Sequence, residues 1–508
     1  MPGHLFITRG DLKRLACDAI LVPSGIWDGR YGHITGKWSS LGLPMEDGRV
    51  TPAPSEESRA VLVCDGSPAI WLGHTGAAGK PPGWYAEAIT AFVRAAGGPS
   101  TPLAKHRPLG DDRPLLGVPV VGIGEGGAFE VKGDVVRETV TAILHTIDDA
   151  NVIADVALVA WTREAYAAAQ QARALVRGDS WLEDQYRETA SALADQARDG
   201  ELVLFMGAGT GIGAGLPTWR GLLDDLRDRA GVTDAEDNKE LDALDPRDAG
   251  LVLDRRLKAR GQSLVEAIIE QVKTEQVSLI HQLLASWPVR EAVTTNYDTC
   301  FERAWSDAGR EHVVLPKVSA QGAKAWLLKL HGSIDDRKRI VLSREDYLRF
   351  EGEGVALAGI VQAMLLTRHM LFVGYSLSDD NFHRLVHQAK TAIGTIEQRP
   401  EALFGTAITP ERPGLSADIW DKDIGFLSTA EEPDGAVRQM AVVLDYVGQQ
   451  AAAPAAHMLD DTYSGVFSVA ELTLRDRLRE LSKAADQPGV RPSVSRAVTE
   501  MIDTLEGI

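Results

Sequence analysis

A glycine-rich stretch behind a short apolar run constrains the fold of this chain more than any other feature. Residues 202–206, Leu-Val-Leu-Phe-Met, form a continuous apolar run, which is typical of a strand buried on both faces of a parallel sheet. Glycines follow at positions 207, 209, 211, 213 and 215, and helical spacing resumes at Arg220. A buried strand, a glycine-rich turn and a helix can form a phosphate cradle, because backbone without Cβ atoms approaches a diphosphate closely. A tight structural turn is the alternative interpretation of the same glycines.

Three further motifs follow the glycine-rich stretch. They are Val293-Thr-Thr-Asn-Tyr-Asp298, Leu328-Lys-Leu-His-Gly-Ser333 and Phe372-Val-Gly-Tyr-Ser-Leu-Ser-Asp-Asp-Asn381. With all four motifs in this order, the region from about residue 190 to 430 resembles the Sir2 (sirtuin) superfamily, especially its SIR2-like branch associated with bacterial defence. The resemblance implies a Rossmann-like α/β domain with a parallel sheet and an enzyme that acts on NAD⁺.

The resemblance implies a role for each matched residue. Asn296 would hold a ribose hydroxyl or the attacking water, and Asp298 would orient the ribose and the nicotinamide side. His331 would act as a general base toward a ribose hydroxyl, a role that suits histidine because its ordinary pKa lies near working pH. The remaining matched positions would bind the dinucleotide: Gly207, Ala208, Gly209, Thr210, Thr218, Trp219, Arg220, Thr295, Gly374, Ser376 and Asp379.

Each of these residue types also has an ordinary structural use. An Asn-x-Asp sequence after a strand frequently forms an Asx turn, and a histidine beside an apolar strand is usually a hydrogen-bonded core residue. A buried core position is the commoner fate of a tryptophan such as Trp219. Asp379 and Asp380 could simply cap the helix that begins near Asn381. The combination of motifs, rather than any single residue, favours the functional interpretation.

Several departures separate this chain from deacylating sirtuins. Gly211 and Thr218 stand where serine and aspartate are common in the family. The cysteines, Cys17, Cys64 and Cys300, form no Cys-x-x-Cys pair, so the zinc module that positions an acyl-lysine groove is not expected. With these departures, the resemblance implies zinc-independent hydrolysis of NAD⁺ to ADP-ribose and nicotinamide by an antiphage effector that depletes NAD⁺. A sirtuin-type deacylase or ADP-ribosyltransferase, and a non-catalytic sensor of ADP-ribose or NAD⁺, are the alternatives.

The first 178 residues predict a separate α/β domain, because short apolar strands alternate with helical stretches. The segment from Arg9-Gly-Asp to Asp18-Ala-Ile-Leu-Val is similar to the start of macro domains, and Gly122-Ile-Gly-Glu-Gly-Gly127 stands where such domains carry a diphosphate-binding loop. This resemblance implies an ADP-ribose-like ligand, with Asp18 at the adenine. Because Pro23-Ser24-Gly25 replaces the usual asparagine-bearing segment, hydrolysis of ADP-ribose conjugates is not expected. A module used only for assembly is the alternative.

Composition and periodicity predict four parts along the chain. A macro-like α/β domain spans residues 1–178, and a helical connector spans 179–199. The Sir2-like NAD-binding catalytic domain spans 200–448, with a helical insertion at about 221–287, and a linker with terminal helices spans 449–508. Further core strands are expected at 290–295, 370–374 and 402–405.

Charge and composition limit the partners that we expect. The chain carries 53 Lys and Arg against 72 Asp and Glu, a formal net charge of −19, which argues against direct nucleic-acid binding. It has no apolar run long enough to cross a bilayer and no signal-peptide pattern, and its scattered cysteines suggest a reducing compartment, so we expect a cytoplasmic location. A freely active NAD⁺ hydrolase would harm its host. We therefore expect control by a homo-oligomer or, by the same resemblance, by a partner such as a helicase-like ATPase or an Argonaute.

Overall fold

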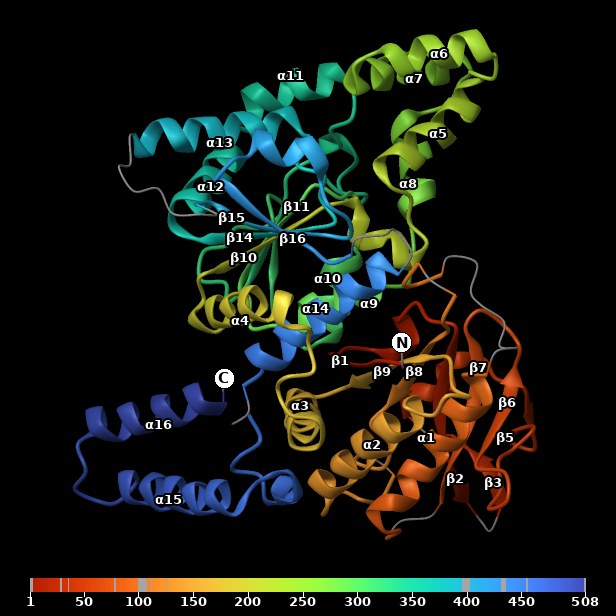
Figure 1. Cartoon of the computed structure of the whole chain (residues 1–508), viewed down its shortest axis with the longest axis vertical. Coiled ribbons are helices and arrows are strands. Elements are labelled where there is room, and N and C mark those ends of the chain that lie inside the picture. Colours follow the sequence, from red (N-terminus) through yellow and green to blue (C-terminus); the bar gives the residue numbers. More distant parts are fainter. Residues whose placement is uncertain are drawn as a thin grey trace. The chain divides into compact units, whose positions relative to one another are not determined.

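The chain divides into two compact units (Figure 1). The first combines Met1–Gln185 with Gly448–Ile508, and the second is Tyr186–Val447. Glu125, inside the expected diphosphate-binding loop, and Ala402, at the start of an expected strand, lie outside the described residues. The computed structural model describes residues 3–27, 30–34, 36–76, 79–98, 107–110, 112–124, 126–394, 403–430, 435–453 and 456–506.

The first unit is built on a mainly parallel sheet of seven strands. The hydrogen-bonded order is β1-β9-β8-β2-β7-β6, and β3 pairs with β2. Every pair is parallel except β6 with β7 and β2 with β3. The strands are β1 (Leu5–Arg9), β2 (Ala19–Trp27), β3 (Arg30–His33), β6 (Ala60–Cys64), β7 (Ala69–Gly76), β8 (Leu115–Pro119) and β9 (Asp155–Ala160), with a separate pair β4 (Met45–Glu46) and β5 (Arg49–Val50).

Three helices bury their apolar sides against this sheet. Phe92, Val140 and Ala168, one from each helix, are fully buried in one core with strand residues such as Leu158. Apolar residues recur at helical spacing in each of them, which is why a single face of each helix reaches the sheet. The helices are α1 (Pro82–Ala96), α2 (Lys132–Ile147) and α3 (Arg163–Arg177).

The C-terminal segment packs within this first unit. Tyr463 and Val466 of η6 (Asp461–Val466) belong to the same buried core. The backbones approach closely, since a Cβ atom on Gly133 would lie 2.6 Å from the Tyr463 carbonyl oxygen. Arg137 also donates from NH1 to the Gly465 carbonyl, 2.6 Å away. The helices α15 (Val469–Ala485) and α16 (Pro492–Glu506) follow.

The second unit contains an all-parallel sheet of seven strands in the order β12-β13-β11-β10-β14-β15-β16. Apart from the edge strand β12, the strands occur along the chain in the spatial order 3-2-1-4-5-6 of a Rossmann fold. The fully buried strand expected at 202–206 is the central strand β10. The strands are β10 (Leu202–Met206), β11 (Glu291–Thr294), β12 (Val313–Leu315), β13 (Trp326–Lys329), β14 (His369–Val373), β15 (Gly405–Thr409) and β16 (Ile424–Ser428).

One expected strand of this sheet was misplaced. The strand expected at 402–405 begins only at Gly405 and runs on to Thr409, where Thr406 and Ile408 continue the ladder with β14 and β16. Their β-branched side chains suit a pleated, buried surface. Phe404 is fully buried although it precedes the strand.

Helices cover both faces of this second sheet (Figure 1). One face is covered by α11 (Arg344–Glu353), α12 (Val355–Thr367) and α13 (Asp380–Ile393), and the other by α4 (Asp184–Asp199), α9 (Leu279–Ser286), α10 (Cys300–Asp307) and α14 (Ala436–Ala451). Within the described residues, no single helix is long and apolar enough to cross a membrane; one bent pair, Arg344–Phe350 with Val355–Thr367, has the required length and composition only when both arms are combined.

A helical insertion separates the first two motifs of the second unit. After β10 the glycine-rich stretch forms the short helix η3 (Ala208–Ala214), and four inserted helices follow before α9. Thr218 and Gly231 delimit the first of them, because Thr218 caps its amino end and Gly231 ends it in the left-handed conformation, with φ 73°. The inserted helices are α5 (Trp219–Ala230), α6 (Ala235–Ala243), α7 (Pro246–Ala259) and α8 (Leu264–Val272).

Candidate active site

The four sequence motifs meet at one edge of the sheet in the second unit. Gly207 follows β10, Asn296 lies just beyond β11, His331 just beyond β13, and Gly374 follows β14. Because these strands are parallel neighbours, their carboxyl ends lie at the same edge. The strand order reverses between β10 and β14, and open α/β sheets bind their ligands at such a switch point, outside the carboxyl ends of the strands.

Close packing of the loops after β10 and β14 explains why residues 207, 209 and 374 are glycines. The N–H groups of Gly207 and Gly209 donate to the carbonyls of Val373 and Gly374, at 3.1 and 2.9 Å. A Cβ atom on Gly209 would lie 2.7 Å from the Gly374 Cα. Gly374 has a φ of +63°, and a Cβ atom there would lie 2.4 Å from the backbone nitrogen of Thr210. The loops after β10 and β14 therefore touch backbone to backbone.

This packing limits what the glycine-rich loop can offer to a diphosphate. The N–H and hydroxyl of the buried Thr210 both donate to the Gly207 carbonyl, at 3.1 and 2.8 Å. The amides of Gly207, Gly209 and Thr210 thus serve the fold. In the described part of the chain, the N–H of the half-buried Ala208 has no acceptor, so Ala208 is the loop position whose amide can meet a ligand.

Asn296 is anchored by its amide nitrogen. Its Nδ2 donates to the Gly207 carbonyl at 3.0 Å and to the Thr210 hydroxyl at 3.3 Å. The neighbouring Thr295 donates its N–H to the Met206 carbonyl at 3.2 Å, which extends the pairing of β10 with β11. Asn296 is half-buried, and none of the described residues donates a hydrogen bond to its Oδ1. That oxygen is therefore available to a hydroxyl group or a water molecule.

Asp298 has a structural role in this structure. Its buried carboxylate accepts the N–H of Cys300 at 2.9 Å, which is the Asx turn weighed above as the ordinary use of an Asn-x-Asp sequence. Lys329, the last residue of β13, donates to the Asp298 carbonyl and lies 3.1 Å from the carboxylate of Glu302. Lys329 is 2% exposed. The sequence analysis did not predict its buried ion pair, although a lysine at the end of an apolar strand is a signal for one.

His331 is buried beside a carboxylate and two aromatic rings. Its Nε2 lies 3.2 Å from Oδ2 of Asp379, although among the described residues it makes no hydrogen bond. The rings of Tyr347 and Phe350 meet the imidazole edge-on, with centroids 5.7 and 6.2 Å away. The following residue must be glycine, because Gly332 has a φ of +91° and a Cβ atom there would lie 2.2 Å from the Arg339 carbonyl oxygen.

Electrostatics favour a charged Asp379 surrounded by neutral phenols. Burial raises the pKa of Asp379, but the neighbouring His331, the Asn381 amide and the charge of Arg247 together lower it below its ordinary value. Burial raises the pKa values of Tyr347 and Tyr375, and the nearby Asp379 adds to both increases. The site therefore combines one carboxylate with protonated tyrosines at neutral pH.

Four predicted binding residues lie at the start of α5 or in the loop after β14. Thr218 caps α5, Trp219 and Arg220 form its first turn, and the hydroxyl of Ser376 pairs with that of the serine two residues on. Thr218, Arg220 and Ser376 are exposed, and Trp219 is half-buried. Across the described ranges, no hydrogen bond or ion pair links any of the four to Asn296 or to the histidine.

The described residues form no evident metal-binding site. Within the part of the chain that the structure describes, no group of three or more His, Cys, Asp or Glu side chains is placed to hold a metal ion. The chain also lacks the paired cysteines of a structural zinc site.

A second group of polar side chains lies inside the first unit. Ser24 and His74 are register partners on β2 and β7, 1% and 0% exposed. The Nδ1 of His74 accepts the N–H of Gly76 at 3.3 Å, so a neutral imidazole carries its hydrogen on Nε2. The indole of Trp84 lies 5.7 Å from the His74 ring, and the guanidinium of Arg59 lies 3.6 Å from the Trp84 ring.

These four side chains leave buried polar atoms without partners. The atoms are Ser24 Oγ, Arg59 NH1, His74 Nε2 and Trp84 Nε1, and none has a hydrogen bond within the described residues. All four can donate a hydrogen bond, and an unsatisfied buried donor costs about 1–3 kcal/mol. We call these four residues the donor cluster. Such a cluster is suited to a ligand rich in acceptor oxygens.

Asp18 does not belong with the expected diphosphate loop. Its carboxylate accepts the N–H of Leu115 at 2.7 Å, where β8 begins, whereas Gly122–Gly127 follows the end of β8. The prediction that Asp18 contacts the same ligand as this loop is therefore corrected, because the two lie at opposite edges of a parallel sheet. The loop instead adjoins α1, where the Tyr85 hydroxyl donates to the Gly126 carbonyl at 3.0 Å.

Comparison with known proteins gives these features a family context. Residues 290–425 match the family model described as a SIR2-like domain. The NAD(+) hydrolase ThsA of Enterococcus faecium is 28% identical over 233 residues, which cover 44% of this chain and 47% of that protein. Defense-associated sirtuin 2 of Bacillus subtilis is 24% identical over 217 residues, covering 41% of this chain and 21% of that protein. This chain thus spans about half or less of the length of these relatives.

One solved structure is also similar. The chain in the solved structure "Structural Basis for the Mechanism and Regulation of Sir2 Enzymes" is 18% identical to this one. The match covers 52% of this chain and 98% of that chain, with a TM-score of 0.32. At that TM-score the likeness supports no conclusion about the fold. The Rossmann-type order rests on the strand pairing itself.

Proposed function

We propose that this chain, whose residues 290–425 form a SIR2-like domain, is an NAD⁺ hydrolase that acts in antiphage defence by depleting NAD⁺. The observation that carries the proposal is the meeting of Asn296 and His331 at the carboxyl ends of adjacent parallel strands, beside the switch point of the sheet. The names of the similar proteins, NAD(+) hydrolase ThsA and defense-associated sirtuin 2, support the same reaction and the same setting.

The proposed reaction assigns separate tasks to the two residues. Water attacks C1′ of the nicotinamide ribose, the C1′–N bond breaks, and nicotinamide leaves with the bonding electron pair. Asn296 holds a ribose hydroxyl or the attacking water through Oδ1, because its Nδ2 is already engaged by Gly207. His331 accepts the proton of a ribose hydroxyl, that hydroxyl takes up the proton lost by the attacking water, and His331 then passes its own proton to solvent. Fixed groups of this kind lower a barrier because they are oriented before the reaction begins.

Substrate binding is proposed for the residues around this edge. The Ala208 N–H is the amide of the glycine-rich loop left for the diphosphate, and Arg220 is the exposed cation of the set. Asp298 acts on the ribose only indirectly, since its carboxylate holds the turn that follows Asn296. Thr218, Trp219, Thr295, Gly374 and Ser376 remain proposed contacts.

We further propose that the first unit binds an ADP-ribose-like ligand that controls the hydrolase. The donor cluster supports this, because the phosphate and ribose oxygens of such a ligand would satisfy its buried donors. Calorimetric titration of the full chain with ADP-ribose tests the idea. Trp84→Phe keeps an aromatic ring but removes the indole N–H, and we expect it to weaken binding about tenfold, as for the loss of one buried hydrogen bond. The half-exposed Trp161 provides the matched Trp161→Phe control.

Light scattering of the same samples addresses assembly. Binding of ADP-ribose without a change in mass supports a sensor. Absence of binding together with self-association would leave assembly as the task of the first unit. Control by a homo-oligomer or by a partner such as a helicase-like ATPase or an Argonaute, and a cytoplasmic location, are part of the same proposal.

A further inference from the structure

The Asp379 carboxylate makes two different contacts with its two oxygens. Oδ1 accepts the N–H of Asn381 at 2.8 Å and thereby caps α13. Oδ2 lies 3.2 Å from Nε2 of His331. The His331 and Asp379 side chains are only 6% and 12% exposed, so solvent screens this contact weakly. Capping needs a single oxygen and no histidine, so the second contact calls for its own explanation.

We propose that Asp379 is a positioning residue for His331 in the hydrolysis of NAD⁺, an inference that rests on the proposed function. The carboxylate selects the imidazole form with its hydrogen on Nε2, because it faces that nitrogen. Nδ1 then keeps the lone pair that takes up the proton. The same carboxylate stabilises the positive charge that His331 gains when it accepts that proton.

The surroundings of His331 leave Asp379 as the partner for this nitrogen. Within the described residues, Nε2 is buried and has no other acceptor. The rings of Tyr347 and Phe350 lie edge-on to the imidazole and restrict its rotation. A buried N–H without an acceptor is costly, so a small adjustment toward the carboxylate is favoured over turning away from it.

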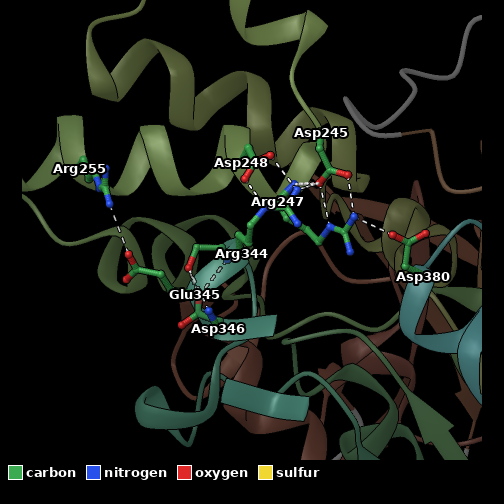
Figure 2. Close-up of polar contacts among 9 residues, drawn as sticks. Asp245, Arg247, Asp248, Arg255, Arg344, Glu345, Asp346 and Asp380 are labelled. Carbon is green, nitrogen blue, oxygen red and sulfur yellow. Dashed lines mark hydrogen bonds and ion pairs between the residues drawn. The ribbon is translucent and has the colours of Figure 1, made fainter. Parts of the chain in front are cut away.

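The helical insertion supports this pair through Arg247 of α7. Figure 2 shows its guanidinium between Asp245 and Asp380, at 2.7 and 2.6 Å. It also lies 5.7 Å from the ring of Tyr347. Arg247 therefore contacts two immediate neighbours of the His331–Asp379 pair, one on α11 and one in the first turn of α13. Its charge is also one of the causes that keep the pKa of Asp379 low.

Arg344 at the start of α11 joins the same group of charges. Its NH2 lies 2.7 Å from Asp248 and 3.3 Å from Asp245, so α11 is tied to the first turn of α7 (Figure 2). Farther along α7, Arg255 reaches Glu345 of α11 at 3.5 Å, and both side chains are largely exposed. Arg255 therefore joins the same two helices as Arg344 does but lies away from Asp380, which makes it a matched control.

The variant Asp379→Asn separates capping from positioning. Asparagine caps helices as well as aspartate does, so α13 and the thermal midpoint should be preserved. Loss of the carboxylate charge should lower kcat about 10- to 100-fold, as for other residues that orient a reactive side chain, with KM changed less than about threefold. The control Asp234→Asn alters an aspartate that caps α6 in the same way, at 2.7 Å from the Glu236 N–H, and should leave kcat unchanged. Unchanged kcat and KM in Asp379→Asn would show that Asp379 only caps the helix.

A spectroscopic measurement tests the same inference without catalysis. In the full chain labelled with ¹⁵N-histidine, the His331 signal is identified by its loss in His331→Ala. We expect the Nε2–H form in the parent and a shift toward the Nδ1–H form in Asp379→Asn. If the parent does not cleave NAD⁺ but shows this dependence, the proposed function fails while the pairing stands. A His331 signal that Asp379→Asn leaves unmoved would overturn the inference even in an active enzyme.

Arg247→Gln extends the test to the insertion. Because Arg247 acts through its neighbours, we expect kcat to fall roughly 2- to 30-fold, the range for residues coupled indirectly to a site. Arg255→Gln should leave kcat within twofold of the parent, about the scatter of such assays. Equal losses in both variants would show that the insertion matters only for general stability.

Discussion

Asn296 donates a hydrogen bond from Nδ2 to the Gly207 carbonyl, 3.0 Å away. This contact ties the residue beyond β11 to the first residue of the glycine-rich stretch, so the first two motifs form one structure. The same contact engages the amide nitrogen of Asn296 in a structural hydrogen bond and leaves its amide oxygen available to a ligand. The arrangement of the loops and the chemistry of the site therefore depend on the same residues.

Gly374→Ala should destabilise the second unit. Gly374 has a φ of +63°, and a Cβ atom would lie 2.4 Å from the Thr210 nitrogen, so strain and overlap add together. We expect a loss of roughly 2–4 kcal/mol in the free energy of unfolding. Gly359→Ala is the control, since a Cβ atom there has no neighbour within 4 Å and a helical alanine is slightly favourable. Equal unfolding midpoints for the two variants would contradict the close packing of these loops.

Lys329→Ala should be more disruptive than removal of both charges of its ion pair. The variant leaves Glu302 partly buried without its partner, 3.1 Å away in the parent, and frees the Asp298 carbonyl. We expect a loss of about 3–5 kcal/mol, and recovery of part of it in Lys329→Met with Glu302→Gln. Lys317, whose side chain is 62% exposed and which lies 4.0 Å from Asp335, should tolerate alanine within about 0.5 kcal/mol. Urea denaturation compares the variants, and a double variant less stable than Lys329→Ala would refute this reasoning.

Stability should fall below about pH 6.5 because of buried neutral histidines. Burial lowers the pKa of His369 to about 4, and its Nε2 lies 2.9 Å from the Thr406 hydroxyl. In the unfolded chain histidine takes up its proton near pH 6.5, so the contribution is complete above that pH and is lost as pH falls toward 4. His369→Gln should reduce this loss by up to about 2 kcal/mol in urea titrations between pH 7.5 and 5. The exposed His145→Gln should not, and identical pH dependence in parent and His369→Gln would contradict the assignment.

Activity should survive removal of divalent metals. No Cys-x-x-Cys pair occurs anywhere in the sequence, so a zinc module of the deacylating type has no ligands. Dialysis against EDTA should leave the rate of NAD⁺ cleavage unchanged, and elemental analysis should find far less than one zinc per chain. Loss of activity on dialysis with recovery on adding zinc would disprove this.

The fold of the second unit was largely readable from the sequence, because its central strands carry strong local signals. Leu202–Met206 is uniformly apolar and became the central strand β10. The packing of Tyr463 into the first unit was not predictable, because it depends on a contact between segments more than 300 residues apart along the chain. Hydrophobic periodicity shows that a residue is buried but not which distant surface buries it.

The candidate site was predicted only in part for the same reason. Motifs identified Asn296 and His331, and strand pairing brought them to one edge of the sheet. Periodicity gave no sign that one oxygen of Asp379 would face His331, or that Arg247 would reach Asp380 from the insertion. Asp18 was misassigned because the sequence does not show at which edge of the sheet a residue beside a strand lies.

The most direct test of this account is incubation of the purified full chain with NAD⁺, with and without ADP-ribose as activator, followed by chromatography for ADP-ribose and nicotinamide. We expect the two products in equal amounts. Asn296→Ala and His331→Ala should each lower the rate by at least about 10²-fold, as for the loss of a general base, while their far-UV spectra match the parent. Cleavage at the parental rate by both variants, or the absence of any cleavage by the parent under every activating condition, would contradict the central claim.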